Sequence, residues 1–268
     1  MCLANGIRIF ALMPTVPLSV VIITFNEEAN IGRCLAALDG LSDDVVVVDS
    51  GSTDRTVAIC REHGARVVVH PFAGYVAQKN FATAQARHNH VLQLDADEVL
   101  TEALRAEIQR VTADWQHAGY SLPRLTNYCG HWVRHGGWYP DRKLRLYDRR
   151  LGAWQGQLLH ERYEVQPGQT LGQLQSDLLH YSYPTIESHV QQLNKFTTIG
   201  AEELAARGKR ANGLQLWVKP TWKFWHLYLL RGGWLDGFAG LSIAALSAWG
   251  VFLKYAKLRV LTRKPAAA

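Results

Sequence analysis

The first hundred residues alternate between short apolar, β-branched runs and stretches whose apolar residues recur at helical spacing. This alternation constrains the fold most. The expected strands cover residues 18–24, 45–48, 66–70 and 91–94, and the helical patterns between them cover residues 31–38, 54–62 and 76–87. Strands and helices that alternate at this pitch form a parallel sheet with helices on its faces. We therefore predict an α/β fold with a mainly parallel sheet flanked by helices.

Polar and acidic segments follow three of these strands, at residues 24–28, 49–54 and 95–98. In open parallel sheets, ligands bind beyond the carboxyl ends of the strands. A dinucleotide-binding fold would show G-x-G-x-x-G after its first strand, but this chain has Thr24-Phe25-Asn26-Glu27-Glu28 there. The chain also has no G-x-x-x-x-G-K-[ST] motif. Dehydrogenase and P-loop nucleotidase functions are therefore disfavoured.

The third segment contains Asp95-Ala96-Asp97 directly after a buried strand. Two carboxylates at that position suit Mg2+ or Mn2+, which would bridge the phosphates of a nucleotide diphosphate. An ordinary acidic loop before a helix capped near Thr101 would show the same two residues. Asp95-Ala96-Asp97 therefore indicates a metal site only when it is taken together with the polar segments at residues 24–28 and 49–54.

These three segments, in this order, closely resemble the family 2 glycosyltransferases of the GT-A fold, and the resemblance covers residues 19–98. It implies that Thr24, Glu27 and Asp49 hold the uridine and ribose, while Asp95 and Asp97 face the diphosphate and its metal. The donor-binding set implied in this way is Thr24, Asn26, Glu27, Asp49, Ser50, Gly51, Lys79 and Asp95.

Four further segments are similar to the branch of family 2 that adds sugars to the lipopolysaccharide core: residues 79–82, 137–140, 143–147 and 154–161. This second resemblance implies transfer of a hexose, glucose from UDP-glucose, with inversion to a lipopolysaccharide inner-core acceptor. The acceptor-binding residues that it implies are Trp138, Tyr139, Arg142, Arg145 and His160.

An inverting transfer needs a base that takes the proton from the attacking hydroxyl group. Glu161 is the candidate base and Asp141 is the alternative, while His160-Glu161 as a structural hydrogen-bonded pair stays open. A zinc-protease motif is excluded because Glu164 stands where H-E-x-x-H needs its second histidine. His180 is similar in position to a histidine that many GT-A enzymes bring to the metal or the diphosphate, and the expected metal ligands are Asp95, Asp97 and His180. The sequence cannot distinguish this role from that of a histidine that is hydrogen-bonded within the protein core.

The chain is expected to divide into four segments. Residues 1–17 form a leader that does not read as a signal peptide, with either Met1 or Met13 as the start of translation. Residues 18–113 form the nucleotide-sugar half, residues 114–206 the acceptor half and residues 207–268 a separate tail. Four cysteines without C-x-x-C spacing indicate a reducing compartment.

The tail has eleven Lys and Arg residues against a single acid, Asp236, and it holds five of the nine tryptophans. Within it, residues 238–253 are sixteen residues without a charge, fewer than the roughly 20 that cross a bilayer. We therefore expect a helical hairpin that lies on, or inserts shallowly into, an anionic membrane surface at the cytoplasmic side of the inner membrane. A helix packed on the domain core is the alternative.

Two other functions fit parts of the sequence. A polyprenyl phosphate could replace the saccharide acceptor, and a non-catalytic protein could bind nucleotide sugars at a membrane. Nucleic-acid binding would explain a basic, aromatic tail, but a sixteen-residue uncharged run is poorly suited to a phosphate groove. We therefore expect no nucleic-acid partner.

Overall fold

The computed structural model describes residues 15–156 and 161–263. Most of the expected leader, and His160 among the expected acceptor residues, lie outside this part of the chain. The described residues fall into two compact units. Among the described residues, the first unit takes residues 15–96, 100–122, 144–156 and 161–176, and the second takes residues 97–99, 123–143 and 177–263.

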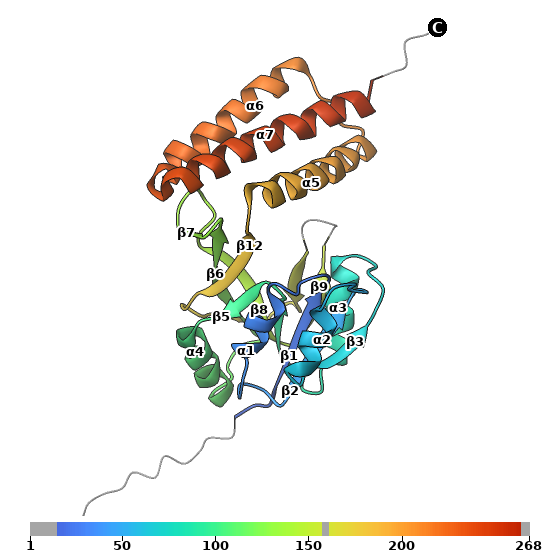
Figure 1. Ribbon diagram of the computed structural model, residues 1–268, viewed down its shortest axis with the longest axis vertical. Coiled ribbons are helices and arrows are strands. Elements are labelled where there is room, and N and C mark those ends of the chain that lie inside the picture. Colours follow the sequence, from blue (N-terminus) through green and yellow to red (C-terminus); the bar gives the residue numbers. More distant parts are fainter. Residues whose placement is uncertain (1–14, 157–160, 264–268) are drawn as a thin grey trace, which may run out of the picture. The chain divides into compact units, whose positions relative to one another are not determined.

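The sheet of the first unit is built on a parallel core of four strands in the order β3-β2-β1-β4. Figure 1 labels β1, β2 and β3 of this core. Strand β8 adds to β4 in the antiparallel direction. The bounds are β1 (Leu18–Thr24), β2 (Asp44–Asp49), β3 (Arg66–Val69), β4 (His90–Asp95) and β8 (Asp141–Asp148). All four strands expected from the apolar runs are present.

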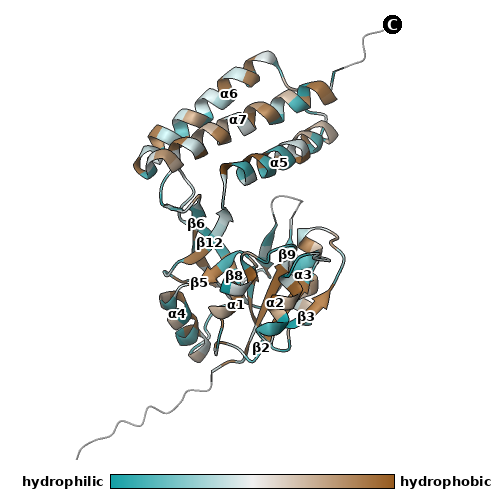
Figure 2. Ribbon diagram, in the orientation of Figure 1, coloured by the Kyte–Doolittle hydropathy of each residue, from teal (hydrophilic) through white to brown (hydrophobic). Residues whose placement is uncertain are grey.

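Strand β1 is buried on both faces, as a continuous apolar run requires, and it is brown in Figure 2. On one face, Val21 and Val46 pack with Ala82 and Ala86, which lie in or beside helix α3. The helices of this region are α1 (Ile31–Ala36), α2 (Thr56–Glu62) and α3 (Tyr75–Gln85). Helix α2 begins two residues later than expected from the sequence. Asp54 stays outside it and accepts a hydrogen bond from the Thr56 amide at 3.0 Å.

One helix and several further strands complete the first unit. Helix α4 (Glu102–Ala113) begins where the Thr101 hydroxyl accepts a hydrogen bond from the Leu104 amide at 3.1 Å. Strands β9 (Gly152–Gln155) and β10 (Arg162–Val165) form an antiparallel pair. Strand β11 (Leu171–Gln173) pairs in parallel with the start of β6 (Gly119–Tyr128).

In the second unit, the end of β6 pairs in parallel with β12 (Leu178–Tyr183) and antiparallel with β7 (His131–Val133). Strand β5 (Glu98–Leu100) borders β12. Three helices follow: α5 (Ile186–Ala206), α6 (Gly213–Trp225) and α7 (Gly237–Leu261). A π-helical turn, η1 (His226–Leu230), and a 3-10 turn, η2 (Gly233–Asp236), join α6 to α7. The expected GT-A architecture, a mainly parallel sheet flanked by helices with a C-terminal helical extension, is therefore confirmed.

The two units do not follow the contiguous segments expected from the sequence. Residues 97–99 and 123–143 group with residues 177–268, so the expected acceptor half contributes to both units and the tail joins one of them. The physical reason is strand pairing, because β6 and β12 bring residues 124–128 beside residues 178–183.

Asp236, the only acid of the tail, fixes the start of α7 to the chain segment that follows β7. Its buried carboxylate accepts hydrogen bonds from the His135 amide at 2.8 Å and the Arg134 amide at 3.3 Å. The His135 ring nitrogen lies 3.1 Å away and the His131 ring nitrogen 3.5 Å away. Burial alone would raise the pKa of Asp236, but the hydrogen bonds from His135 and Arg134 hold it below the ordinary value of 3.8.

We expect Asp236→Asn to lower the free energy of unfolding by about 2–4 kcal/mol at pH 7, because buried donors lose a charged acceptor. A carboxyl group whose pKa is lowered by folding stabilises the protein above its unfolded pKa, and this contribution is lost as the pH falls through the folded pKa. The loss of unfolding free energy in the variant should therefore be full at pH 7. It should shrink as the pH falls below 3.8, the pKa of this carboxyl group in the unfolded chain. Denaturant unfolding at several pH values measures it. The exposed Asp114→Asn serves as the control, and a deficit independent of pH would contradict the assignment.

Candidate active site

The carboxyl ends of three neighbouring strands bring Thr24, Asp49 and Asp95 to one edge of the first unit's sheet. Thr24 of β1 pairs with Asp49 of β2, and Ile23 of β1 pairs with Asp95 of β4. The Thr24 hydroxyl oxygen is buried and has no hydrogen-bond partner among the described residues. The edge thus combines two carboxylates with a buried hydroxyl group that a ligand can satisfy.

The loops after β1 and β2 are held together by hydrogen bonds. One carboxylate oxygen of the buried Asp49 accepts from the amides of Gly51 and Ser52, both at 2.9 Å. The Asn26 amide donates to the Ser52 hydroxyl at 2.8 Å, and the Asn26 side-chain oxygen accepts from the Thr53 amide at 2.9 Å. Asn26 has a φ of 52°, a left-handed conformation that asparagine tolerates better than most residues. Asn26, Asp49 and Gly51 therefore shape the edge in the free protein.

Glu27 and Ser50 are tied to neighbouring helices. The Glu27 amide donates to the Thr56 hydroxyl at 2.8 Å, and its carboxylate accepts from the Asn30 side chain at 2.7 Å. The Ser50 hydroxyl accepts from the buried Gln78 side chain at 3.1 Å. Gln78 was not expected from the sequence. In the sequence, Gln78 could have been noticed only as a polar residue on the otherwise apolar face of the helix expected there.

A charged cluster lies beside Asp95, and we call Lys79, Asp95, Arg145 and Glu161 the Lys79 cluster. The Lys79 ammonium nitrogen is 3.6 Å from an Asp95 carboxylate oxygen and 3.2 Å from a Glu161 carboxylate oxygen. Arg145 donates to the other Asp95 oxygen at 2.5 Å. Lys79 and Arg145 are both buried. Two cations and two carboxylates balance in formal charge, which limits the cost of taking them out of water.

The Lys79 cluster connects the donor edge to the candidate base. Glu161 was expected on the acceptor side, and the structure brings its carboxylate to the same lysine that contacts Asp95. Arg145, expected to bind the acceptor, instead lies against Asp95. Lys79 also lies 4.6 Å from the centre of the Trp154 ring. One buried ammonium group therefore links residues from α3, β4 and the chain next to β10.

Asn80 explains why the Lys79 and Trp154 segments meet. Its side-chain nitrogen donates to the Trp154 carbonyl at 2.9 Å, and its side-chain oxygen accepts from the Trp154 amide at 3.0 Å. This paired contact fixes β9 against α3. Asn80 and Trp154, from two of the segments that carry the resemblance to the lipopolysaccharide branch, are thus neighbours in space.

In the second unit, Asp97 and His180 lie together. The His180 Nε2 atom is 3.1 Å from an Asp97 carboxylate oxygen, and the Tyr181 amide donates to the Asp97 carbonyl at 2.9 Å. The described residues contain no group of three His, Cys, Asp or Glu side chains that could hold a metal ion. One carboxylate and one imidazole still fit Mg2+ or Mn2+, because such ions keep several positions for phosphate oxygens and water.

Asp141, the alternative base, is engaged by two cations. Arg124 donates to one Asp141 carboxylate oxygen at 2.5 Å, and Lys143 lies 3.0 Å from the other. Burial favours the neutral acid, but Arg124 and Lys143 outweigh it and hold the pKa of Asp141 below its ordinary value. A carboxylate stabilised in this way is a weak proton acceptor. Glu161 is also paired with a cation, Lys79 at 3.2 Å, so the choice of Glu161 over Asp141 as the base stays a prediction.

The other expected acceptor residues are placed in the second unit. Trp138 packs against Tyr128, with ring centres 6.0 Å apart, and against Tyr183 at 5.8 Å. The Tyr139 hydroxyl donates to Asp177 at 2.9 Å. Arg142 is half-buried. Trp138 packs, partly buried, against a core cluster that includes Tyr128, and the acceptor-binding roles of Trp138, Tyr139 and Arg142 stay predictions.

Comparisons with known proteins agree with the geometry. The family model Glycosyl transferase family 2 matches residues 19–163. An uncharacterized glycosyltransferase of Rickettsia typhi is 31% identical over 257 residues, which cover 92% of this chain and 88% of the relative. The lipopolysaccharide core biosynthesis glycosyltransferase LpsC of Rhizobium meliloti is 32% identical over 260 residues, covering 92% of this chain and 93% of LpsC.

Among solved structures, glucosyl-3-phosphoglycerate synthase from Mycobacterium tuberculosis, in complex with Mn2+, uridine-diphosphate and glucosyl-3-phosphoglycerate, is 26% identical. The matched region covers 42% of this chain and 44% of the synthase chain, and the TM-score is 0.36. The family model spans more than half of the chain, and LpsC aligns over nearly its whole length. The protein therefore belongs to glycosyl transferase family 2 and is a glycosyltransferase.

Proposed function

We propose that this enzyme transfers a hexose, glucose from UDP-glucose, with inversion to a lipopolysaccharide inner-core acceptor. The observation that carries the proposal is the buried Lys79, which contacts Asp95 at the donor edge and Glu161, the candidate base. The acceptor class is supported by the similarity to LpsC, whose name assigns it to lipopolysaccharide core biosynthesis.

In this proposal the donor's uridine and ribose bind at the edge formed by Thr24, Glu27 and Asp49. The Thr24 hydroxyl supplies an unsatisfied buried group, and Asp49 keeps its loop closed through Gly51 and Ser52. Asn26 and Ser50 support the same loops. We assign Lys79 and Arg145 to the diphosphate, because buried cations that are already oriented by Asp95 favour negative charge without reorganisation.

Asp97 and His180 would hold Mg2+ or Mn2+, with Asp95 two residues away in the chain. A divalent cation there supplies charge neutralisation for the departing diphosphate. Asp95 has both of its oxygens beside protein cations. We therefore assign it to orienting those cations in addition to facing the donor.

Glu161 acts as the base. Its carboxylate accepts the proton of the acceptor hydroxyl group while that oxygen forms a bond to the anomeric carbon of the sugar. The bond between the anomeric carbon and the diphosphate oxygen breaks with both electrons leaving on UDP. Lys79, at 3.2 Å, holds the Glu161 carboxylate toward the donor edge in the free enzyme.

A lipid-linked acceptor places the enzyme at a membrane. We propose the cytoplasmic side of the inner membrane, with the enzyme bound as a peripheral or monotopic protein through residues 207–268. The support is one apolar helical stretch, Gly233–Leu261, which is long enough to cross a bilayer by length and composition, together with the basic charge of the tail.

The test is a panel of UDP-sugars offered to the purified protein with and without Mg2+ or Mn2+. We expect UDP-glucose to raise the melting temperature most and to release UDP only when a divalent ion is present, because ligands that bind the folded state stabilise it. A different best sugar would revise the donor. The absence of any stabilisation by UDP-sugars would contradict the proposal. A lipid-linked product formed without a saccharide acceptor would favour a polyprenyl phosphate.

A further inference from the structure

The outer surface of the α6–α7 hairpin exposes large apolar side chains at helical spacing. In α6 they are Leu214, Trp217, Val218, Trp222 and Trp225, and in α7 they are Phe238, Leu241, Trp249 and Val260. Trp217 is 73% exposed and Phe238 is 74% exposed. The turns between the two helices add Leu229, Leu230, Trp234 and Leu235. Large apolar side chains that gather on an exposed surface mark interaction sites for proteins or membranes.

Ring contacts connect the two stripes into one surface, which we call the hairpin face. The Trp217 ring of α6 lies 6.4 Å from the Phe252 ring of α7, and Phe252 stacks with Trp249 at 5.0 Å. Because Phe252 contacts both rings, the exposed Trp217 of α6 and Trp249 of α7 border the same surface.

Charge complements the apolar surface. Lys219 of α6 donates to the Tyr255 hydroxyl at 2.6 Å, so a cation lies among the aromatic rings. Arg259 and Arg263 are exposed near the end of α7. The single acid of the tail, Asp236, is buried and bonded to His135. A surface with tryptophans and cations but no exposed acid matches the interface of an anionic bilayer.

We propose that the hairpin face docks onto an anionic lipid bilayer with α6 and α7 in the plane of the interface. This inference rests on the membrane location given under the proposed function and adds the docking surface and its orientation. The tryptophans lie at headgroup depth, and the cations contact anionic headgroups.

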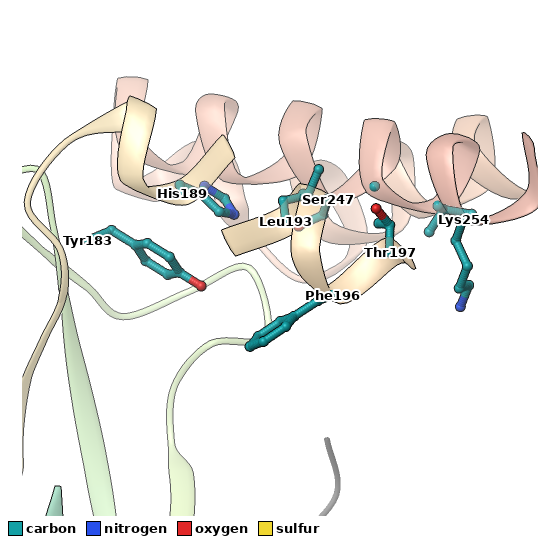
Figure 3. Close-up of a pocket in the computed structure, with 9 residues that line it drawn as sticks. Tyr183, His189, Leu193, Phe196, Thr197, Ser247 and Lys254 are labelled. Atoms are coloured by element: carbon teal, nitrogen blue, oxygen red, sulfur yellow. The ribbon is translucent and has the colours of Figure 1, made fainter. Parts of the chain in front are cut away.

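The packing of α5 explains why α7 lies in the interface although it is long enough to span. Gly250 of α7 is so close to Leu193 of α5 that a Cβ atom there would be 2.9 Å from the leucine side chain. Figure 3 shows Leu193 and Thr197 of α5 beside Ser247 and Lys254 of α7. Lys257 also donates to the Asn194 carbonyl at 2.8 Å. Helix α7 is thus fixed along α5.

Helix α5 is polar on its outer side, with exposed Glu187, Lys195 and Glu202. A spanning α7 would take these charged side chains into the hydrocarbon region, where each costs several kcal/mol. Only 28% of the most apolar α7 window is buried inside the protein, because its other face is the hairpin face. A helix that lies in the plane of the interface keeps the charged side chains of α5 out of the hydrocarbon region and places the hairpin face against the lipid.

The first test is flotation of the full-length protein with phosphatidylcholine vesicles, with or without phosphatidylglycerol. We expect wild-type protein to float with the anionic vesicles and the combined variant Trp217→Ser, Trp222→Ser, Phe238→Ser to bind at least about tenfold more weakly. The matched control replaces two exposed apolar residues elsewhere, Phe72→Ser and Leu171→Ser, and should float as wild type does. Equal flotation of the triple variant and wild type would overturn the proposal.

The second test separates an in-plane helix from a spanning one. Cysteines are placed at Arg231→Cys and Arg263→Cys, one near each end of α7, in a background with Cys2 and Cys129 replaced by Ser. An impermeant thiol reagent added outside sealed vesicles should label both positions without detergent. Protection of one position until detergent is added would show that α7 crosses the bilayer and would reject the in-plane orientation.

Donor binding distinguishes a failure of this inference from a failure of the proposed function. Stabilisation by UDP-glucose in detergent does not require the hairpin face, so the triple variant should keep it. Lost flotation with retained donor stabilisation supports the docking surface. Normal flotation of a protein that binds no UDP-sugar would leave the docking surface in place and reject the proposed function.

Discussion

Glu161→Gln should transfer sugar about a hundred to ten thousand times more slowly than wild type while UDP-sugar binding stays within a few fold. Glutamine keeps the size of the side chain and can still accept a hydrogen bond from Lys79 through its carbonyl oxygen. It cannot take the proton of the attacking hydroxyl group. Initial rates of UDP release with acceptor, together with thermal stabilisation by UDP-glucose, measure the two quantities separately.

Glu164→Gln is the matched control. Glu164 lies three residues further on in β10, where it pairs with Arg162 at 2.6 Å and takes no part in the Lys79 cluster. Its transfer rate should equal that of wild type. Normal transfer by Glu161→Gln would exclude Glu161 as the base. Asp141→Asn would then be the next variant to measure, although Arg124 and Lys143 already occupy the Asp141 carboxylate.

Asp97→Ala should lower turnover by about a hundred to a thousand fold and remove the dependence of UDP binding on divalent metal. The reason is that Asp97 supplies the carboxylate of the Asp97–His180 pair, 3.1 Å apart, that we assign to the metal. Titration of UDP against the protein, with and without Mn2+, should show two curves for wild type and a single weak curve for the variant. The fold should persist, because the Asp97 carbonyl still accepts from the Tyr181 amide.

The control for this change is Asp39→Ala, the same substitution at an exposed residue of the first unit. It should leave both UDP curves unchanged. His180→Ala should weaken the metal dependence in the same direction as Asp97→Ala, since both side chains belong to the proposed ligand pair. A fully active Asp97→Ala variant would remove the metal role of this residue.

The sequence by itself determined the parallel core and one edge of the site. Strands buried on both faces give continuous apolar runs, so β1, β2 and β4 could be read directly, and the side chains that follow them had to share an edge. Asp49 and Asp95 were therefore placed correctly beside β1. These are local signals, because a strand and the turn after it occupy one short window.

Only the tertiary structure decided which distant side chains meet. Lys79 and Glu161 are separated by 82 residues, and Arg145 lies 50 residues beyond Asp95. The sequence also did not reveal that Trp138 packs, partly buried, against a core cluster that includes Tyr128. The sequence around a charged or aromatic residue does not show whether its side chain is exposed to solvent, paired with an opposite charge or packed in the core. Its partner depends on which segments distant in the sequence come together in the fold, as β6 does with β12 and α3 does with β9.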